Sequence, residues 1–321
     1  MAKTTSVFKS EAGLIIIALT TLIMFIFGSE WLTGSPTSGM ITALFIWLFV
    51  IMLWASFAVV RHADALAVLL GEPYGTLVLT LAVISIEVVM VSAIMVTGVD
   101  NPTLGRDMIF SVLMIVLNGL IGFSLLLGGL RHREQDYNLR GANTYISVLI
   151  PLAVLGLILP AQITNRDGGG LSTFYSIFLI TMTIGLYIVF LIVQTIRHQD
   201  YFICRVAETE SESEVDSHAH HGIVIRSLPF HLVFLFAYML PIILLSKKMA
   251  VLIDLGITAA GAPIALSGFL VAILVLSPEG LAAVNAALED RIQRSINIGL
   301  GSALATIGLT IPAVLTIGMI T

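Results

Sequence analysis

Apolar residues occur along this chain in long blocks that are separated by short polar stretches. Crossing a bilayer as a helix takes about 20 mostly apolar residues, and nine blocks approach or exceed that length. They cover approximately residues 12–30, 40–60, 75–97, 107–129, 143–161, 172–196, 225–246, 262–287 and 296–319. The pattern therefore predicts an all-α polytopic membrane protein with about nine transmembrane helices in this chain.

Two of the apolar blocks each contain a single charged residue, and in both cases it is a glutamate. Glu87 lies within 79–96 and Glu279 within 264–287, and a serine precedes each by two positions, Ser85 and Ser277. A carboxylate near the middle of a bilayer costs roughly 2.5–3.5 kcal/mol on insertion scales. Its presence there indicates a functional site, and the matching contexts predict one ion site built from two halves.

The residues around Glu279 favour oxygen ligands for a hard cation. Pro278 has no amide hydrogen, so a carbonyl one turn earlier loses its helical partner and the helix is expected to bend. A freed carbonyl, a serine hydroxyl and a carboxylate together suit Ca²⁺ or Na⁺. Protons compete with cations for a buried carboxylate, and two carboxylates could exchange two protons for one Ca²⁺. The alternative for either glutamate alone is a hydrogen bond that packs helices together.

Other polar residues in the apolar blocks are weaker candidates. Asn118, Ser302 and Thr306 could line an ion site, or could simply serve close helix packing and cross-helix hydrogen bonds. Glu72 precedes Glu87 by about 22 Å of helix, so it is expected at the cytoplasmic mouth, where it either attracts cations or faces water. The remaining candidates are His62 and His231, which in such positions are more often structural than ion-handling.

Composition agrees with a membrane protein and charge gives its orientation. Of the 321 residues, 58% are hydrophobic and 11% charged, and the mean hydropathy of +1.03 is far too high for a soluble domain. With the N-terminus in the cytoplasm, eleven basic residues face the cytoplasm and four the other side, which fits the positive-inside rule. The four are Arg106, Arg166, Lys247 and Lys248.

The longest polar stretch, residues 197–224, divides the apolar blocks into two groups. Its low apolar content and high charge predict a largely disordered cytoplasmic linker. It could act as a cation or proton sensor, or it could be only a solvated connector. The acidic and histidine residues on which a sensor would depend are Glu208, Glu210, Glu212, Glu214, Asp216, His218, His220 and His221.

The two glutamates lie five predicted spans apart, in the third and eighth. An odd number of spans per repeat makes two copies enter the membrane from opposite sides, as in inverted-repeat transporters. When Glu87 is aligned with Glu279, Ser85 meets Ser277. Arg106 meets Arg294 after four residues are skipped. The predicted organisation is an extra helix (1–34), a first repeat (35–196), the linker (197–224) and a second repeat (225–321).

Several function classes lack their sequence signals. There is no phosphate-binding G-x-x-x-x-G-K-[ST] loop for an ATP-driven pump, and neither a serine–histidine nor a paired-aspartate arrangement typical of an intramembrane protease is visible. The single cysteine, Cys204, excludes a disulfide framework. We therefore expect a transporter rather than an enzyme, without a cofactor. Its partners would be lipid, cations and protons and not nucleic acid, and a homo-oligomer is left open. A cation channel is the main rival, because acidic rings also select cations.

Five motifs resemble the bacterial cation:proton antiporters of the calcium/cation antiporter superfamily. They lie at 61–64, 70–75, 122–129, 276–280 and 301–310. The resemblance implies an inner-membrane exchanger, specific for Ca²⁺ or for Na⁺ or K⁺, with one extra helix and two inverted five-helix repeats around an acidic loop. Glu87 and Glu279 match the central ion-binding acids. Positions near these acids are matched by Ser85, Asn118, Ser277 and Ser302.

The chain differs from the pattern of this superfamily in length. Two five-helix repeats and one extra helix make eleven spans, whereas this chain stops after the ninth, so the last two helices of the second repeat appear missing. A transport-incompetent truncated fragment is therefore a further alternative.

Overall fold

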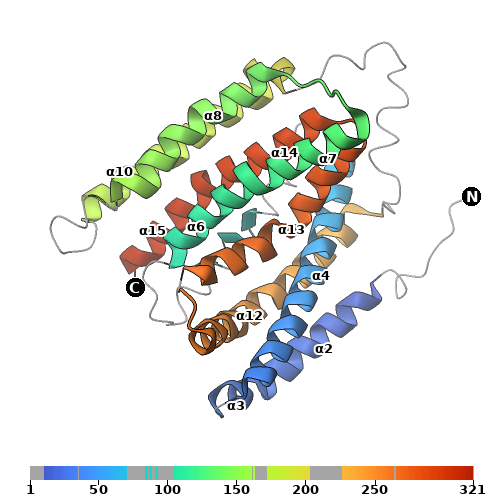
Figure 1. Cartoon of the computed structure of the whole chain (residues 1–321), viewed down its shortest axis with the longest axis vertical. Coiled ribbons are helices and arrows are strands. Elements are labelled where there is room, and N and C mark those ends of the chain that lie inside the picture. Colours follow the sequence, from blue (N-terminus) through green and yellow to red (C-terminus); the bar gives the residue numbers. More distant parts are fainter. Residues whose placement is uncertain are drawn as a thin grey trace, which may run out of the picture. The chain divides into compact units, whose positions relative to one another are not determined.

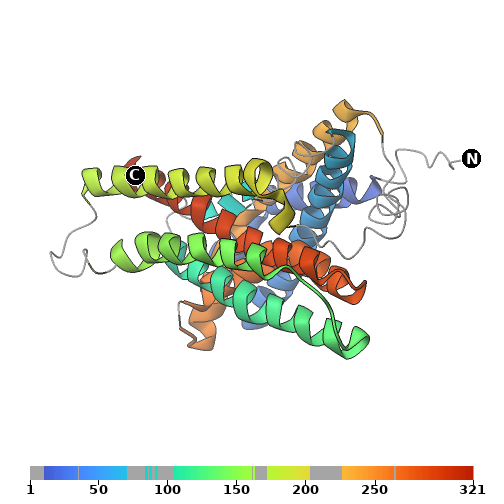
Figure 2. The same cartoon turned by 90° about the horizontal axis from the view of Figure 1, so that it is seen from above.

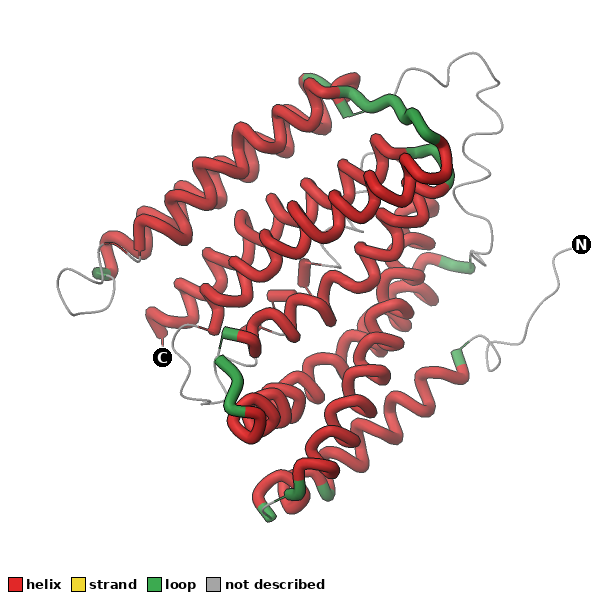
Figure 3. Tube along the Cα trace, viewed as in Figure 1, coloured by secondary structure: helices red, strands yellow, loops and turns green. Residues whose placement is uncertain are grey.

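The computed structural model describes residues 11–34, 36–70, 84–85, 87–88, 91–92, 104–160, 162, 172–202, 226–263 and 265–320. Within these ranges the chain forms helices joined by loops and turns, without strands (Figure 3). The predicted all-α class is confirmed for this part of the protein. Figure 1 shows the helices and their labels.

Among the described residues, seven helices are long and apolar enough to cross a membrane, so the protein is a multi-pass membrane protein. They are Ser38–Leu70, Arg106–His132, Leu139–Ile158, Thr173–Arg197, Leu228–Ala260, Leu266–Leu288 and Ile292–Met319. The predicted count of nine is not confirmed. The block at 75–97 falls mostly outside the described residues. The first block forms the helix α2 (Ala12–Ile26), about 22 Å long at 1.5 Å per residue, and a second short helix, α3 (Gly28–Thr33), follows.

Two helices extend well beyond the blocks from which they were predicted. The helix α4 covers Ser38–Leu70 instead of 40–60, and α12 covers Leu228–Ala260 instead of 225–246. Charged residues end an apolar block, but they do not end a helix. Both helices therefore continue past them. A backbone signal ends α12, because Gly261 has a φ of 63° and closes the helix with the left-handed conformation that glycine tolerates.

The chain folds into two compact units, and the first comprises Met1–Leu104 and Ile225–Val275. Its main packing is between α4 and α12, which contact each other along their length, with α2 against both. Buried residues follow α4 at spacings of three or four, which places them on one stripe of the helix. The stripe contains Leu48, Met52, Ala55, Val59, Ala63 and Leu66.

The second unit comprises Gly105–Val224 and Leu276–Thr321. In it α8 (Leu139–Ala153) and α10 (Thr173–Ile192) lie side by side (Figures 1 and 2). The helix α14 (Ile292–Ala305) packs against α8 and α7 (Ile121–His132), and α15 (Ile311–Ile320) packs against α10. The predicted domain boundaries refer to repeats rather than to compact units, and they stay a prediction.

Two stretches of the second unit have the same build. One consists of α6 (Leu104–Met114), the π-helical turn η1 (Ile115–Leu120) and α7, and the other consists of α14, the π-turn η6 (Thr306–Thr310) and α15. The two stretches have the same length. The second begins 188 residues after the first, at 292 instead of 104, and also ends 188 residues later, at 320 instead of 132. The same shift aligns Arg106 with Arg294, which supports the predicted internal repeat.

Polar side chains tie together the loops at one end of the second unit. Gln135 donates to the carbonyl of Ala287 at 2.9 Å, and Asn297 donates to the carbonyl of Phe202 at 2.7 Å. The 3₁₀ turn η4 (Gln199–Tyr201) lies so close to α8 that a Cβ on Gly141 would overlap the carbonyl oxygen of Tyr201. The segment that enters the linker is therefore packed firmly onto α8 and α14.

This packing predicts that Gly141→Ala lowers stability. The added methyl group meets a backbone oxygen that cannot rotate away, and overpacking of this kind costs about 1–3 kcal/mol. Gly185→Ala in α10 is the matched control, because nothing lies within 4 Å of its Cβ position, and alanine is the better helix former by about 1 kcal/mol. Thermal unfolding in detergent should show a lower melting temperature for the first variant only. Equal melting temperatures would contradict the close packing.

Candidate functional site

The helix α13 (Leu266–Leu288) carries Glu279 in its interior. The helix continues through Pro278, so the proline removes one hydrogen-bond donor without ending the helix; the expected bend stays a prediction. Pro278 is buried and Glu279 is partly exposed. Gly280 follows, and a Cβ there would lie 3.6 Å from Cδ1 of Leu120, which is ordinary van der Waals contact.

Ser302 of α14 donates a hydrogen bond from its hydroxyl to Oε2 of Glu279. The two residues are 23 positions apart in sequence, on helices that follow each other in the chain. The bond joins two of the predicted site residues. A hydroxyl that donates to a carboxylate stabilises its ionised form, and the same hydroxyl oxygen keeps lone pairs that a cation could share. Glu279 and Ser302 therefore form an oxygen-rich pair whose atoms suit either a proton or a hard cation.

The π-turn η6 begins four residues after Ser302. Thr306 and Thr310, at its two ends, are 1% and 0% exposed. π-turns interrupt the regular pattern of helical hydrogen bonds and occur frequently at functional sites. The irregular backbone here lies one turn from the Glu279–Ser302 pair, which places buried hydroxyl groups and altered carbonyls on the same helix as Ser302.

Asn118 lies in the corresponding π-turn η1, but the structure does not bring it into contact with Glu279. Its side chain is exposed, and its amide donates to the carbonyl of Met114 at 3.3 Å, within its own helix. This geometry is that of a local helix contact. The predicted ligand role of Asn118 gains no support from this hydrogen bond and stays a prediction.

Glu87 and Ser85 belong to the first unit. Both are helical, Glu87 is 2% exposed and Ser85 is half-buried. A glutamate buried to this extent fits the expected functional role. Ser277 is half-buried on α13. The meeting of Glu87 with Glu279 in one site stays a prediction. Glu72 and the acidic and histidine residues of the linker lie outside the described residues.

One buried hydroxyl had not been singled out from the sequence. Ser124 on α7 is 1% exposed, and its oxygen has no hydrogen-bond partner among the described residues. A buried polar atom without a partner is unusual in proteins. The signal that could have found it is its motif, since Ser124 lies between Gly122 and Gly128 in an otherwise apolar segment.

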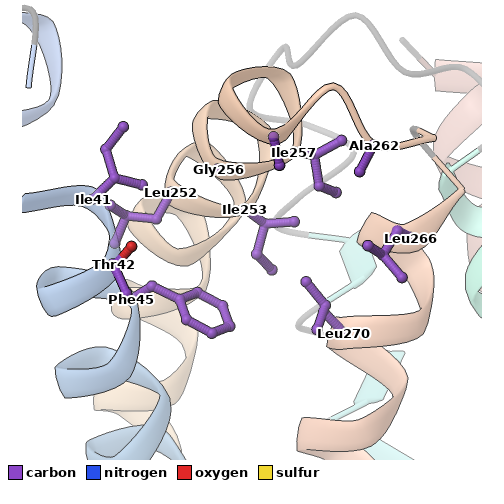
Figure 4. Close-up of a pocket in the computed structure, with 11 residues that line it drawn as sticks. Ile41, Thr42, Phe45, Leu252, Ile253, Gly256, Ile257, Ala262, Leu266 and Leu270 are labelled. Carbon is purple, nitrogen blue, oxygen red and sulfur yellow. The ribbon is translucent and has the colours of Figure 1, made fainter. Parts of the chain in front are cut away.

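The described part of the chain holds no group of three or more His, Cys, Asp or Glu side chains placed to bind a metal ion together. A cavity of about 190 Å³ lies in the first unit among α4, α12 and the start of α13 (Figure 4). Its wall is apolar except for Thr42, so its chemistry does not suit a cation. Among the described residues, the best candidate for ion exchange is therefore the Glu279–Ser302 pair.

Comparison with known proteins shows the family of the chain. Residues 40–196 match the sodium/calcium exchanger protein family. The chain is 40% identical over 311 residues to the sodium-potassium/proton antiporter ChaA of Escherichia coli, covering 97% of this chain and 82% of that protein. The chain belongs to the sodium/calcium exchanger family. The resemblance to the calcium/cation antiporter superfamily, inferred above from five motifs, is thereby confirmed.

Solved structures show the same fold. YfkE in its native form superposes with a TM-score of 0.64 at 15% identity, over 96% of this chain and 82% of that one. The H⁺/Ca²⁺ exchanger CAX gives a TM-score of 0.58 at 15% identity, over 97% and 75% of the two chains. The helical arrangement of this family member is therefore that of the exchanger fold.

The Ser302–Glu279 bond predicts a spectroscopic signature. In infrared difference spectra between proton-loaded and cation-loaded protein, a protonated carboxyl band should disappear in Glu279→Gln. The same band should shift in Ser302→Ala, because the carboxyl then loses its hydroxyl partner. Ser111→Ala is the matched control, since that hydroxyl donates to the carbonyl of Asp107 in its own helix. An unshifted band in Ser302→Ala would contradict the contact.

Proposed function

We propose that this family member is a secondary-active antiporter that exchanges cytoplasmic cations for protons across the bacterial inner membrane. The observation that carries the proposal is the hydrogen bond between Ser302 and Glu279 on neighbouring membrane helices. The names of relatives support it, since ChaA is a sodium-potassium/proton antiporter. In the proposed orientation the N-terminus is cytoplasmic, as the distribution of basic residues indicates.

Exchange follows from competition for one carboxylate. When Glu279 is protonated, it is neutral and the site has little attraction for a cation. When the proton leaves, the carboxylate and the Ser302 hydroxyl can hold a cation in its place. A transporter that exposes this site alternately to the two sides couples the two fluxes, because proton and cation exclude each other. No ATP is needed, and no cofactor takes part.

The proposed second half of the site is Glu87, with Ser85 and Ser277 near the two acids. Two carboxylates would release two protons for each Ca²⁺ and leave the total charge of the site unchanged. With Na⁺ or K⁺ the same balance requires one proton for each cation. The relative that shares 40% of its residues favours Na⁺ or K⁺ by its name, whereas a site with two carboxylates favours Ca²⁺.

Cation-evoked proton flux in everted or reconstituted vesicles tests the proposal. Na⁺, K⁺ and Ca²⁺ are added separately. Flux with at least one ion is expected, and it should be abolished in Glu279→Gln and in Glu87→Gln. Ser302→Ala should weaken the apparent cation affinity, by roughly tenfold if the lost contact is worth about 1.4 kcal/mol, because the cation loses the hydroxyl oxygen as a ligand. Ser111→Ala and Glu289→Gln are controls, since the side chain of Glu289 is 62% exposed.

Three outcomes would contradict parts of the proposal. Flux that persists in both glutamate variants would remove the carboxylate mechanism. Cation current without coupled proton movement would indicate a channel. The absence of flux with every ion, together with its recovery in a longer chain, would indicate that residues 1–321 are a transport-incompetent piece of the exchanger.

A further inference from the structure

Apart from the Glu279–Ser302 pair of the second unit, the first unit contains a buried polar cluster of its own. Glu11, at the start of α2, accepts a hydrogen bond from Arg61 at 2.7 Å and another from Tyr238 at 2.9 Å. His62 lies 3.4 Å from the same carboxylate oxygen and 3.0 Å from His231, measured between their Nδ1 atoms. His62 is 2% exposed and His231 3%. The two histidines were interpreted as structural from the sequence, but the structure shows that they contact each other.

The hydrogen bonds fix which nitrogen of each ring carries a proton. The backbone N–H of Arg226 donates to Nε2 of His231 at 2.9 Å, so the proton of a neutral His231 must be on Nδ1. That Nδ1–H then donates to Nδ1 of His62. The proton of His62 is therefore on Nε2, which lies 3.4 Å from the carboxylate of Glu11 and 3.4 Å from a guanidinium nitrogen of Arg61. Arg226, His231, His62 and Glu11 form a chain of donors and acceptors that is complete when both histidines are neutral.

The environment favours this arrangement. Phe234 stacks on the His62 ring at 5.6 Å between centroids, and Phe230 lies 4.9 Å beneath the Arg226 guanidinium. Burial opposes ionisation of Glu11, but the hydrogen bond from Tyr238 and the charge of Arg61 outweigh burial and hold the pKa of Glu11 below its ordinary value. Glu11 therefore stays charged as the pH falls toward neutrality and below, and the histidines are the groups that change.

An added proton cannot be accommodated without breaking one link. Protonated His62 carries hydrogens on both ring nitrogens, so two N–H groups would face each other across the 3.0 Å contact. Protonated His231 would instead oppose the N–H of Arg226. The charged groups that face the pair are Glu11, Arg61 and Arg226. Glu11 attracts a charge on His62, while the two arginines repel it. If His231 keeps its bond to protonated His62, its own proton must move from Nδ1 to Nε2, and the bond from the N–H of Arg226 is then lost.

We propose that His62 and His231 form a proton-binding site that releases the backbone N–H of Arg226, two residues after the linker, when the cytoplasm becomes acidic. Release loosens the start of α12 and slows cation export at a pH where importing further protons would harm the cell. The transport half of this proposal rests on the proposed antiport function, whereas proton binding and release do not.

Glutamine variants test the site because glutamine keeps one donor and one acceptor but cannot take up a proton. The purified full chain is melted at about pH 8 and about pH 5.5, on either side of the ordinary histidine pKa. Histidines held neutral in the fold must become charged as the pH falls, and stability is lost with the broken link. The wild-type melting temperature should fall by several degrees, and the double variant His62→Gln/His231→Gln should lose most of this fall. His198→Gln is the control, because that ring stacks on Tyr201 outside the cluster.

Histidine NMR of the wild-type protein tests the same site without the double variant, which could fail to fold. In ¹⁵N-histidine NMR, one buried ring should show an Nε2–H tautomer and the other an Nδ1–H tautomer near pH 8. Acidification should remove both signals together. Two rings of the same tautomer, or an unchanged pH dependence of melting in the double variant, would overturn the proposal.

Transport distinguishes this inference from the proposed function. Proton flux in wild type should decline several-fold as the pH on the cytoplasmic side falls through the histidine range. The double variant should show a clearly smaller decline, which leaves only the competition of protons at Glu279. If no variant transports any cation, the antiport proposal fails, while melting and NMR still decide the proton site. If wild type transports and the double variant shows the same decline with pH, the regulatory role is overturned.

Discussion

A carboxylate inside an apolar helix requires compensation, and this requirement shapes the second unit of the protein. Water is absent from the membrane interior, so an acidic side chain must be neutralised, paired or hydrogen-bonded by the protein itself. Glu279 has the hydroxyl of Ser302 as its donor in the described part of the chain. The helices α13 and α14 must therefore keep their register for the bond to form. Gly299 lets α14 pack closely on α7, because a Cβ there would lie only 3.1 Å from Ile121.

Glu11 and Glu279 show opposite ways of meeting the same requirement. Glu11 accepts from Arg61 and Tyr238 and lies beside His62, so its negative charge is balanced within the protein. Such a carboxylate has no need of a proton or a cation and suits a structural role. Within the described ranges the donor to Glu279 is a neutral hydroxyl, which satisfies part of the hydrogen-bonding capacity of the carboxylate but does not balance its charge. A proton or a cation could supply the rest, and that difference supports the proposal that Glu279 is the exchanging group.

Much of the fold could be predicted from the sequence because apolar blocks reflect the bilayer directly. The block at 262–287 corresponds closely to α13, and Glu279 and Ser302 were both expected near the site. Helix ends were less predictable, since α12 continues past Lys247 and Lys248 until Gly261 ends it. The contact between His62 and His231 could not be predicted, because 169 residues separate them and no periodicity relates them. The hydrogen bond from Asn118 to Met114 could not be predicted either, because the sequence pattern shows only that residue 118 is polar.

Different kinds of side chain hold the two ends of the linker. Its acidic and histidine residues suggested a sensor, yet the described contacts lie at its two ends. At the start, Asn297 holds the carbonyl of Phe202 and Asn138 holds that of Asp200. At the far end, His231 holds the N–H of Arg226. The first anchor uses uncharged amides whose bonds do not change with pH in the physiological range, whereas the second uses an imidazole. Of these two anchors, a change of pH in that range therefore acts on the second, as the proposed proton site requires.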